Sequence, residues 1–377
     1  MSLDANDANK GFKKLEELWK EEIEKIGDEN LHKVAFIQDE HLIDEIRSII
    51  NGENMSYKYA LLTQLLAKLI DPSLNALALQ KKAKVAGAFD ARSFCKRTVV
   101  IFEEKYLEGV LGRSKDPYVS KPLRHKIVSL DIVEEIKDKE GWRALYNILN
   151  TVQSRNDVNF TESVLKQVLL EIRRFLINVQ AIRKFSIKKS PTLVELTEAV
   201  YKFLSDPSEG ARPQVIIYAL MKVINKRLNV FKNIEATKAT VADKTARRLA
   251  DIECRDESGA VKVGISVTEV LDANKLKEEL DKSVQRGVRK LILLASEIKQ
   301  DPLLHETINS YMKSYNLDII VESIVGFTGL FVTLLNNNMR EEFIREVANT
   351  LNELGYQSHL IDWINILREI GIIEIQR

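Results

Sequence analysis

The chain has 377 residues, of which 45% are hydrophobic and 29% are charged, as in an ordinary globular protein of one large or two smaller domains. The net charge is only +1, so a surface for a polyanionic partner must be a local patch. No apolar run reaches the roughly 18 residues of a membrane span, and the charged N-terminal segment does not have the pattern of a signal peptide. Two cysteines without metal-ligand spacing, Cys95 and Cys254, indicate a reducing compartment, so we expect no membrane contact and a cytoplasmic location.

From about residue 10 to residue 190, apolar side chains recur with a helical period. A long stripe of this kind runs from Val164 to Val179, and a shorter one from Tyr59 to Leu69. With 15 glycines and 7 prolines in the whole chain, little sequence is available for turns. We therefore predict a helical domain over residues 1–190, and we expect the three tryptophans, which lie in helical stretches, to be core residues: Trp19, Trp142 and Trp363.

The pattern changes over residues 191–377, where short β-type runs alternate with helical ones. The predicted elements are a helix at 210–227, a strand at 230–236, a polar loop at 238–248, strands at 249–255 and 260–268, a helix at 272–286, a strand at 290–295, a helix at 301–315, a strand at 317–322, and helices over 325–372. This order predicts a mixed sheet flanked by helices. The fold class is a helix-rich α/β protein with a helical N-terminal domain.

Strands 249–255 and 260–268 form a predicted antiparallel hairpin that carries acidic side chains. Side chains alternate along a strand, so Asp251 and Glu253 share one face. On the second strand the apolar residues from Val261 to Val267 form the core face, and the opposite face carries Lys262, Gly264, Ser266 and Thr268. Carboxylates are hard oxygen ligands for Mg²⁺, and Asp251 and Glu253 are therefore the candidate metal ligands.

A magnesium-dependent nuclease core presents an acid at the end of one strand and Glu-x-Lys on the next. Here the acid is Asp251, but the Glu-x-Lys positions contain Ser266 and Thr268, whose neutral hydroxyls replace neither charge. Two nearby residues are candidate substitutes: Lys262 lies on the same face, and Glu269 points to the other face unless the strand bulges. The spacing alone favours a solvated acidic hairpin over a nuclease site, because an acid-x-acid pattern near a turn is common.

Several segments resemble those of one enzyme family, the SacI-like type II restriction endonucleases. The segments are Gly87–Lys96 followed by Val99–Phe102, then Asp116–Arg124, Glu209–Gln214, Ala250–Glu253 and the Val263–Thr268 strand. They occur in this order, and the resemblance spans roughly residues 55 to 345. The resemblance implies a nuclease domain of the PD-(D/E)xK type behind a helical domain that recognises double-stranded DNA. It also implies that Asp251 is the metal-binding acid, with Ser266 and Thr268 at the positions of the family's Glu and Lys.

This departure leaves two functions open. One is a Mg²⁺-dependent, site-specific DNA endonuclease with a rearranged or impaired site. The other is a non-catalytic, sequence-specific DNA-binding protein on a nuclease scaffold. We expect cleavage to be weak or absent, DNA binding to persist, and Ser266→Glu with Thr268→Lys to switch cleavage on. By analogy with enzymes that cut palindromes, we expect a homodimer.

The local distribution of charge indicates which residues are candidates for contact with DNA. Residues 81–124 contain 11 lysines and arginines against 5 acidic residues. A DNA-facing surface and a solvated or salt-bridged face both remain open. We also expect segments 87–124 and 238–251 to line one basic cleft. The candidates are Arg92, Lys96, Lys121 and Arg124 in the basic segment, Arg212 and Gln214 in the third resembling segment, and Lys244, Arg247 and Arg248 in the loop before the first acid.

Overall fold

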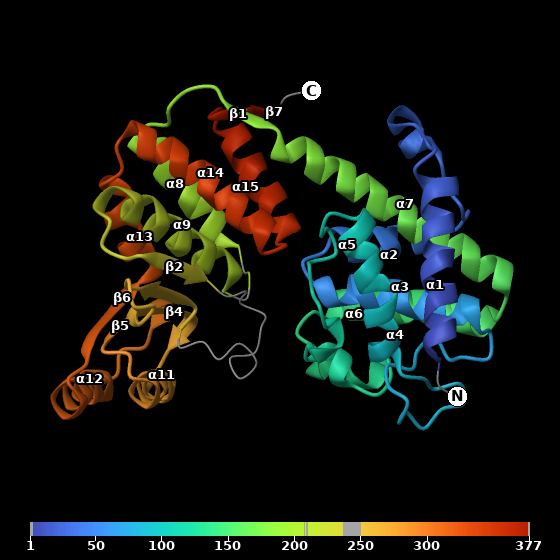
Figure 1. Ribbon diagram of the computed structural model, residues 1–377, viewed down its shortest axis with the longest axis horizontal. Helices are drawn as coiled ribbons and strands as arrows, with labels where there is room; N and C mark the ends of the chain where they lie inside the picture. The colour runs from blue at the N-terminus through green and yellow to red at the C-terminus, as the bar shows by residue number, and fades with distance from the viewer. Residues whose placement is uncertain (1–2, 207, 209, 237–249, 376–377) are drawn as a thin grey trace. The chain divides into compact units, whose positions relative to one another are not determined.

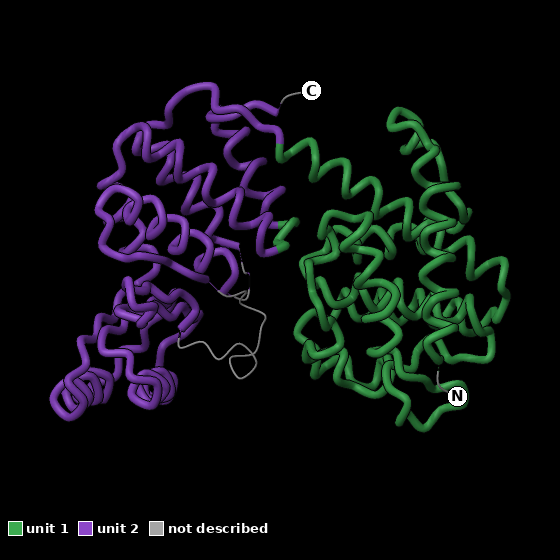
Figure 2. Tube along the Cα trace, in the orientation of Figure 1, with its two compact units in different colours: residues 1–183, 355–358 green, residues 184–354, 359–377 purple. Residues whose placement is uncertain are grey.

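The computed structural model describes residues 3–206, 208, 210–236 and 250–375. The chain divides into two compact units, shown in different colours in Figure 2. Unit 1 comprises residues 1–183 and 355–358, and unit 2 comprises residues 184–354 and 359–377. The domain boundary expected at residue 190 falls just after this division, and no pattern in the sequence indicated that residues 355–358 pack with unit 1.

Unit 1 is helical, as the sequence predicts. Its α-helices are α1 Ala5–Leu18, α2 Glu40–Asn51, α3 Met55–Ile70, α4 Ala91–Arg97, α5 Val99–Tyr106, α6 Lys139–Arg155 and α7 Val158–Arg183. Helix α3 is the central one, because every residue from Ser56 to Lys68 is buried. It packs against α1, α4, α6 and α7, among others, so it is surrounded by other helices on all sides. Trp19 and Trp142 are also buried, which confirms their predicted core role.

Unit 2 contains a five-stranded mixed sheet with the strand order β2-β3-β4-β5-β6. The strands are β2 Asn233–Ala236, β3 Ile252–Arg255, β4 Val261–Leu271, β5 Lys290–Ile298 and β6 Asp318–Ser323. The pairs β2–β3 and β3–β4 are antiparallel, whereas β4–β5 and β5–β6 are parallel. The predicted hairpin and its place in the sheet are therefore confirmed. The polar loop predicted at 238–248 lies outside the described residues.

Helices cover both faces of this sheet (Figure 1). On one face, α8 Leu193–Ser205, α9 Ala211–Leu228 and α13 Ile324–Thr333 pack on Ile252, Ile265 and their neighbours. On the other face, α11 Ala273–Arg286 and α12 Pro302–Tyr315 pack on Leu291, Leu293 and Leu271. The expected core face of β4 is confirmed, since Val263, Ile265 and Val267 belong to the first core. The opposite face is covered as well, because α11 and α12 are the crossover connections between parallel strands.

The chain ends with two further helices, α14 Asn337–Glu353 and α15 Gln357–Glu369, as expected from the sequence. Helix α14 packs on α9, and Trp363 of α15 is buried. A small antiparallel pair that the sequence did not indicate joins β1 Phe185–Ile187 to β7 Ile373–Ile375. Within the described residues, no helix is both long and apolar enough to cross a membrane.

Candidate active site

Asp251 lies immediately before β3 and is bound to the neighbouring strand through its side chain. The backbone amide of Val267 on β4 donates to Asp251 Oδ2 over 2.7 Å. Strand β3 begins only at Ile252, which pairs with Ile265, so this carboxylate satisfies an amide just beyond the ladder between the two strands. The backbone carbonyl of Asp251 accepts a hydrogen bond of 3.1 Å from Gln214 of α9. Strand β4 therefore holds the side chain of Asp251, and helix α9 holds its backbone carbonyl.

Ser266 lies beside Asp251 on β4, and its side chain points toward helix α11. Its hydroxyl donates to Oε2 of Glu279 over 3.2 Å, and both residues are buried, with 7% and 8% of their surface exposed. A buried carboxylate requires hydrogen-bond donors or cations around it. The serine therefore marks the point where strand β4 meets a carboxylate from a helix.

Glu279 lies between two lysines of its own helix. Lys275 Nζ and Lys282 Nζ are each 3.0 Å from Glu279 Oε1, one turn before and one turn after it. Both lysines also contact the more exposed Glu278, at 3.3 and 2.9 Å. Burial lowers the pKa of Lys275, but its hydrogen bond to Glu279 and the nearby carboxylate charges outweigh that effect and raise the pKa above 10.5. The cluster thus combines a buried carboxylate, Glu279, with a lysine, Lys275, whose raised pKa keeps it protonated.

Glu253, the second expected metal ligand, is fully buried on the same face as Ser266, opposite Gly264 of β4. Arg255 forms an ion pair with it and also contacts Glu235 of β2 at 3.4 Å. This arrangement favours a structural role for Glu253 over metal binding.

The two expected substitutes for the missing groups do not approach Ser266. Lys262 is exposed near the hairpin turn and pairs with Asp256 at 2.9 Å. Glu269 is exposed on the opposite side of β4, and the pairing of β4 with β5 shows no bulge that would turn it inward. The hydroxyl of Thr268 donates to the carbonyl of Val270 over 3.2 Å. The geometry therefore favours neither Lys262 nor Glu269 as a catalytic group.

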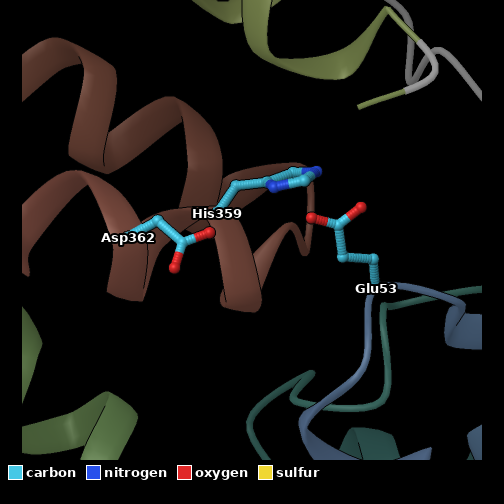
Figure 3. Close-up of side chains that lie close together, drawn as sticks. All are labelled: Glu53, His359 and Asp362. Carbon is cyan, nitrogen blue, oxygen red and sulfur yellow. The ribbon is translucent and has the colours of Figure 1, made fainter. Parts of the chain in front are cut away.

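Arg212 of α9 was expected at the DNA, but it is 2% exposed. Its guanidinium bonds to Asp206 at 2.9 Å, to Asp362 at 2.6 Å and to His359 at 3.3 Å. His359 and Asp362 both project from α15 in Figure 3, and the third side chain drawn there, Glu53, belongs to unit 1. These contacts favour a structural role for Arg212, which ties α9 to α15.

Gln214, the second expected DNA contact on α9, is also buried, at 1% exposure. Its bond to the Asp251 carbonyl makes it a residue that positions the acid.

Among the basic candidates of unit 1, Arg92 and Lys96 share one partner. Arg92 forms a bidentate ion pair with Asp116, and Lys96 lies 3.4 Å from the same carboxylate. The salt-bridged alternative therefore describes these two residues better. Lys121 and Arg124 are exposed, as a contact with DNA requires.

Further exposed lysines lie in the chain segment next to Lys121 and Arg124. Gln80 donates to the Arg124 carbonyl at 2.7 Å, and Ala78 pairs with Ile127, so the two segments run side by side. The resulting cluster, here named the basic surface of unit 1, consists of Lys81, Lys82, Lys84, Lys121, Arg124 and Lys126.

Lys244, Arg247 and Arg248 lie outside the described residues, and so does most of the 238–251 segment. Their expected contact with DNA stays a prediction. The single cleft expected from segments 87–124 and 238–251 also stays a prediction, because the two segments belong to different units.

Sequence reasoning missed Glu279 and Lys275. The only signal was their spacing, because two residues four apart on a helix lie on one face. Leu276 and Leu280 of the same helix show which face meets the sheet, and Glu279 and Lys275 flank it.

Comparison with known families gives two matches. The model of the SacI restriction endonuclease N-terminal domain matches residues 11–173, and the model of the C-terminal domain matches residues 189–297. No curated protein matches the chain. The first match lies within unit 1, and the second contains Asp251, Ser266 and Glu279 in unit 2. The chain therefore belongs to the SacI restriction endonuclease family.

Proposed function

We propose that this protein is a type II restriction endonuclease that hydrolyses double-stranded DNA at a specific sequence in a Mg²⁺-dependent reaction. The observation that carries the proposal is the position of Asp251. It lies immediately before β3, where its carboxylate is held against β4 of a mixed sheet in the domain that matches the nuclease family. Such a carboxylate fits a hard divalent cation, which binds oxygen ligands.

In the proposed reaction a water oxygen forms a bond to phosphorus while the bond from phosphorus to the leaving sugar oxygen breaks. The leaving oxygen keeps the electron pair and takes up a proton, and the attacking water gives a proton to solvent. A Mg²⁺ ion bound at Asp251 would lower the pKa of that water and neutralise developing charge. Asp251 orients the reacting groups, and Gln214 holds the acid in place.

The partner would be double-stranded DNA, and the basic surface of unit 1 supports that part of the proposal. Lys81, Lys82 and Lys84 are exposed next to Lys121, and a cluster of cations binds the phosphate backbone without reading its sequence. The homodimer expected by analogy stays a prediction. Two-fold symmetry in the protein would match a palindromic site.

The test is cleavage of long DNA of mixed sequence with Mg²⁺ and, separately, Mn²⁺. Ser266 and Thr268 alone predict weak or absent cleavage. Because a buried carboxylate and a lysine lie beside Ser266, we instead expect discrete fragments from the wild-type chain. We expect Asp251→Asn to lower the cleavage rate by at least about 10²-fold and to leave DNA affinity within a few-fold. Asparagine keeps an oxygen that accepts the Val267 amide, so the fold should persist. Glu257→Gln, in the exposed turn of the same hairpin, is the matched control and should cut normally.

The second candidate is a DNA-binding protein without cleavage, and it is favoured by the neutral side chains of Ser266 and Thr268. If the wild-type chain binds one duplex sequence selectively but cuts no DNA with either metal, this second candidate replaces the first. If Asp251→Asn cuts at the wild-type rate, the assignment of the site to this hairpin is wrong.

A further inference from the structure

We propose that helix α11 supplies the two charged groups that strand β4 lacks. In this proposal Glu279 is the second carboxylate that holds the metal, and Lys275 is the cation beside the reacting phosphate. The inference rests on the proposed nuclease function and deepens it, because it names which residues complete the site. Neither residue lies in the Asp251–Thr268 hairpin, where the sequence indicated the chemistry.

The first step of the argument is the contact between Ser266 and Glu279. A glutamate on β4 at residue 266 would extend its carboxylate past the position of the serine hydroxyl. The Glu279 carboxylate already occupies that region, at 3.2 Å from the hydroxyl. The short serine side chain leaves room for it and donates a hydrogen bond to it. The strand next to Asp251 therefore has a buried carboxylate beside it, although its own sequence provides none.

The second step is the direction of α11. Since β4 and β5 are parallel, the helix between them runs back along the sheet, antiparallel to β4. From Ser266 to Thr268 the strand advances by about 7 Å toward its end. From Glu279 back to Lys275 the helix covers about 6 Å in the same direction. These ideal rises lead us to expect the backbone of Lys275 at about the level of Thr268, the position that lacks the lysine.

The third step is the choice between the two lysines that contact Glu279. Lys282 is equally close to the carboxylate, at 3.0 Å, but lies on the opposite side of it along the helix. In the antiparallel arrangement that side corresponds to Gly264, away from Thr268. Lys282 is therefore the matched control for Lys275. Glu278, which touches both lysines but is 54% exposed, is the matched control for Glu279.

The experiment compares four single variants of the full chain: Glu279→Gln, Lys275→Gln, Glu278→Gln and Lys282→Gln. Three quantities are measured: the cleavage rate, the melting temperature without metal, and the rise in melting temperature caused by Mn²⁺. Mn²⁺ stabilises the folded protein only where it binds, so this rise reports on the metal site without requiring turnover.

For Glu279→Gln we expect a cleavage rate lower by about 10²–10³-fold and loss of the Mn²⁺-induced rise. For Lys275→Gln we expect a similar loss of rate with the rise retained, since a cation does not hold the metal. Both control variants should keep the rate and the rise within a few-fold. A Glu279→Gln variant that melts earlier but cuts and responds to Mn²⁺ normally would show that the cluster is only a structural ion-pair network.

Moving the carboxylate from the helix to the strand tests the same idea through a gain of function. Glu279→Ser should be inactive, and adding Ser266→Glu should restore cleavage by returning the carboxylate to the strand. Failure of that double variant, in a folded protein, counts against the proposal. Activation of an inactive wild-type chain by Ser266→Glu with Thr268→Lys would overturn it, because the strand positions would then be the ones required.

The outcomes for the function and for the inference remain separate. If the wild-type chain neither cuts nor responds to Mn²⁺, and Ser266→Glu with Thr268→Lys does not activate it, the proposed function fails. If the wild-type chain cuts in an Asp251-dependent way and Glu279→Gln cuts equally well, only the inference about α11 fails.

Discussion

Glu103 of α5 is a buried carboxylate around which a loop of unit 1 closes. The backbone amides of Leu111, Gly112 and Arg113 donate to its Oε1 over 3.0, 3.0 and 3.1 Å, and the Tyr59 hydroxyl donates to its Oε2. Gly112 has φ +126°, a backbone conformation that favours glycine. Burial raises the pKa of Glu103, and these donors only partly oppose that effect.

We expect Glu103→Leu to destabilise the protein strongly and Glu103→Gln to destabilise it less. Leucine leaves three amides without an acceptor, at about 1–3 kcal/mol for each buried donor. Glutamine keeps one accepting oxygen for them. The measurement is the free energy of unfolding in urea. A leucine variant as stable as the wild type would contradict this account of the loop.

The same carboxyl predicts a pH dependence. Because its folded-state pKa lies above the unfolded value, the folded protein binds the proton more tightly than the unfolded chain does. The stabilisation that comes from proton binding at Glu103 is therefore fully present below the pKa of the unfolded state. It is lost as the pH rises through the pKa of the folded state. Urea unfolding of Glu103→Gln at several acid and neutral pH values should lack this component. An unchanged pH profile would show that another group is responsible.

At the scale of the element, α11 is held at both ends and along one face. Asp272 caps its N-terminus by accepting from the Lys275 amide at 2.8 Å, and Gly287 ends it with φ +73°. Leu276 and Leu280 bury the apolar face against β5 and α12. The position of Glu279 beside Ser266 therefore depends on how this face packs.

We expect Leu280→Ala to lower stability by about 2–5 kcal/mol and to lower cleavage as well, because the helix that carries Glu279 shifts. Leu304→Ala is the matched control, since Leu304 lies in the same core but on α12, which carries no residue of the site. Both variants are assayed well below their melting temperatures. Equal losses of cleavage in the two would indicate a general effect of stability rather than displacement of α11.

At the scale of the whole molecule, the net charge of +1 hides an uneven distribution. The basic surface of unit 1 contains six exposed cations, three of them in the run Lys81, Lys82 and Lys84. Helix α1 and the turn after it are different, since Lys10 and Lys25 lie close to Asp7 and Glu21 there. A polyanion should therefore bind at the basic surface of unit 1 rather than at helix α1.

Replacing Lys81, Lys82 and Lys84 by glutamine should weaken DNA binding uniformly across sequences. The slope of log affinity against log salt should also fall, by about 0.9 for each phosphate that the protein no longer neutralises. The control removes the same charge at Lys10, Lys13 and Lys25 and should leave the slope unchanged. Fluorescence anisotropy with a labelled duplex at several salt concentrations measures both. An equal change in the two triple variants would mean that only net charge matters.

The sequence by itself determined the family and most elements around the sheet, although it indicated neither α8 nor the β1–β7 pair. The apolar alternation from Val261 to Val267 predicted strand β4, and the helical period at 272–286 predicted α11, because these patterns depend on neighbours along the chain. The segments that resemble the SacI family lie in the regions that both domain models match. The sequence also showed that Ser266 and Thr268 depart from Glu-x-Lys.

Only the tertiary structure decided which side chains meet. The sequence offered Lys262 and Glu269 as substitutes because they are close along the strand, whereas the crossover brings Glu279 to Ser266 from another element. Arg212 looked like a DNA contact until packing placed it against Asp362 of α15. A periodic pattern records which face of an element is buried. The partner of a buried charge is set by how segments far apart in the chain pack together, and no local pattern records that.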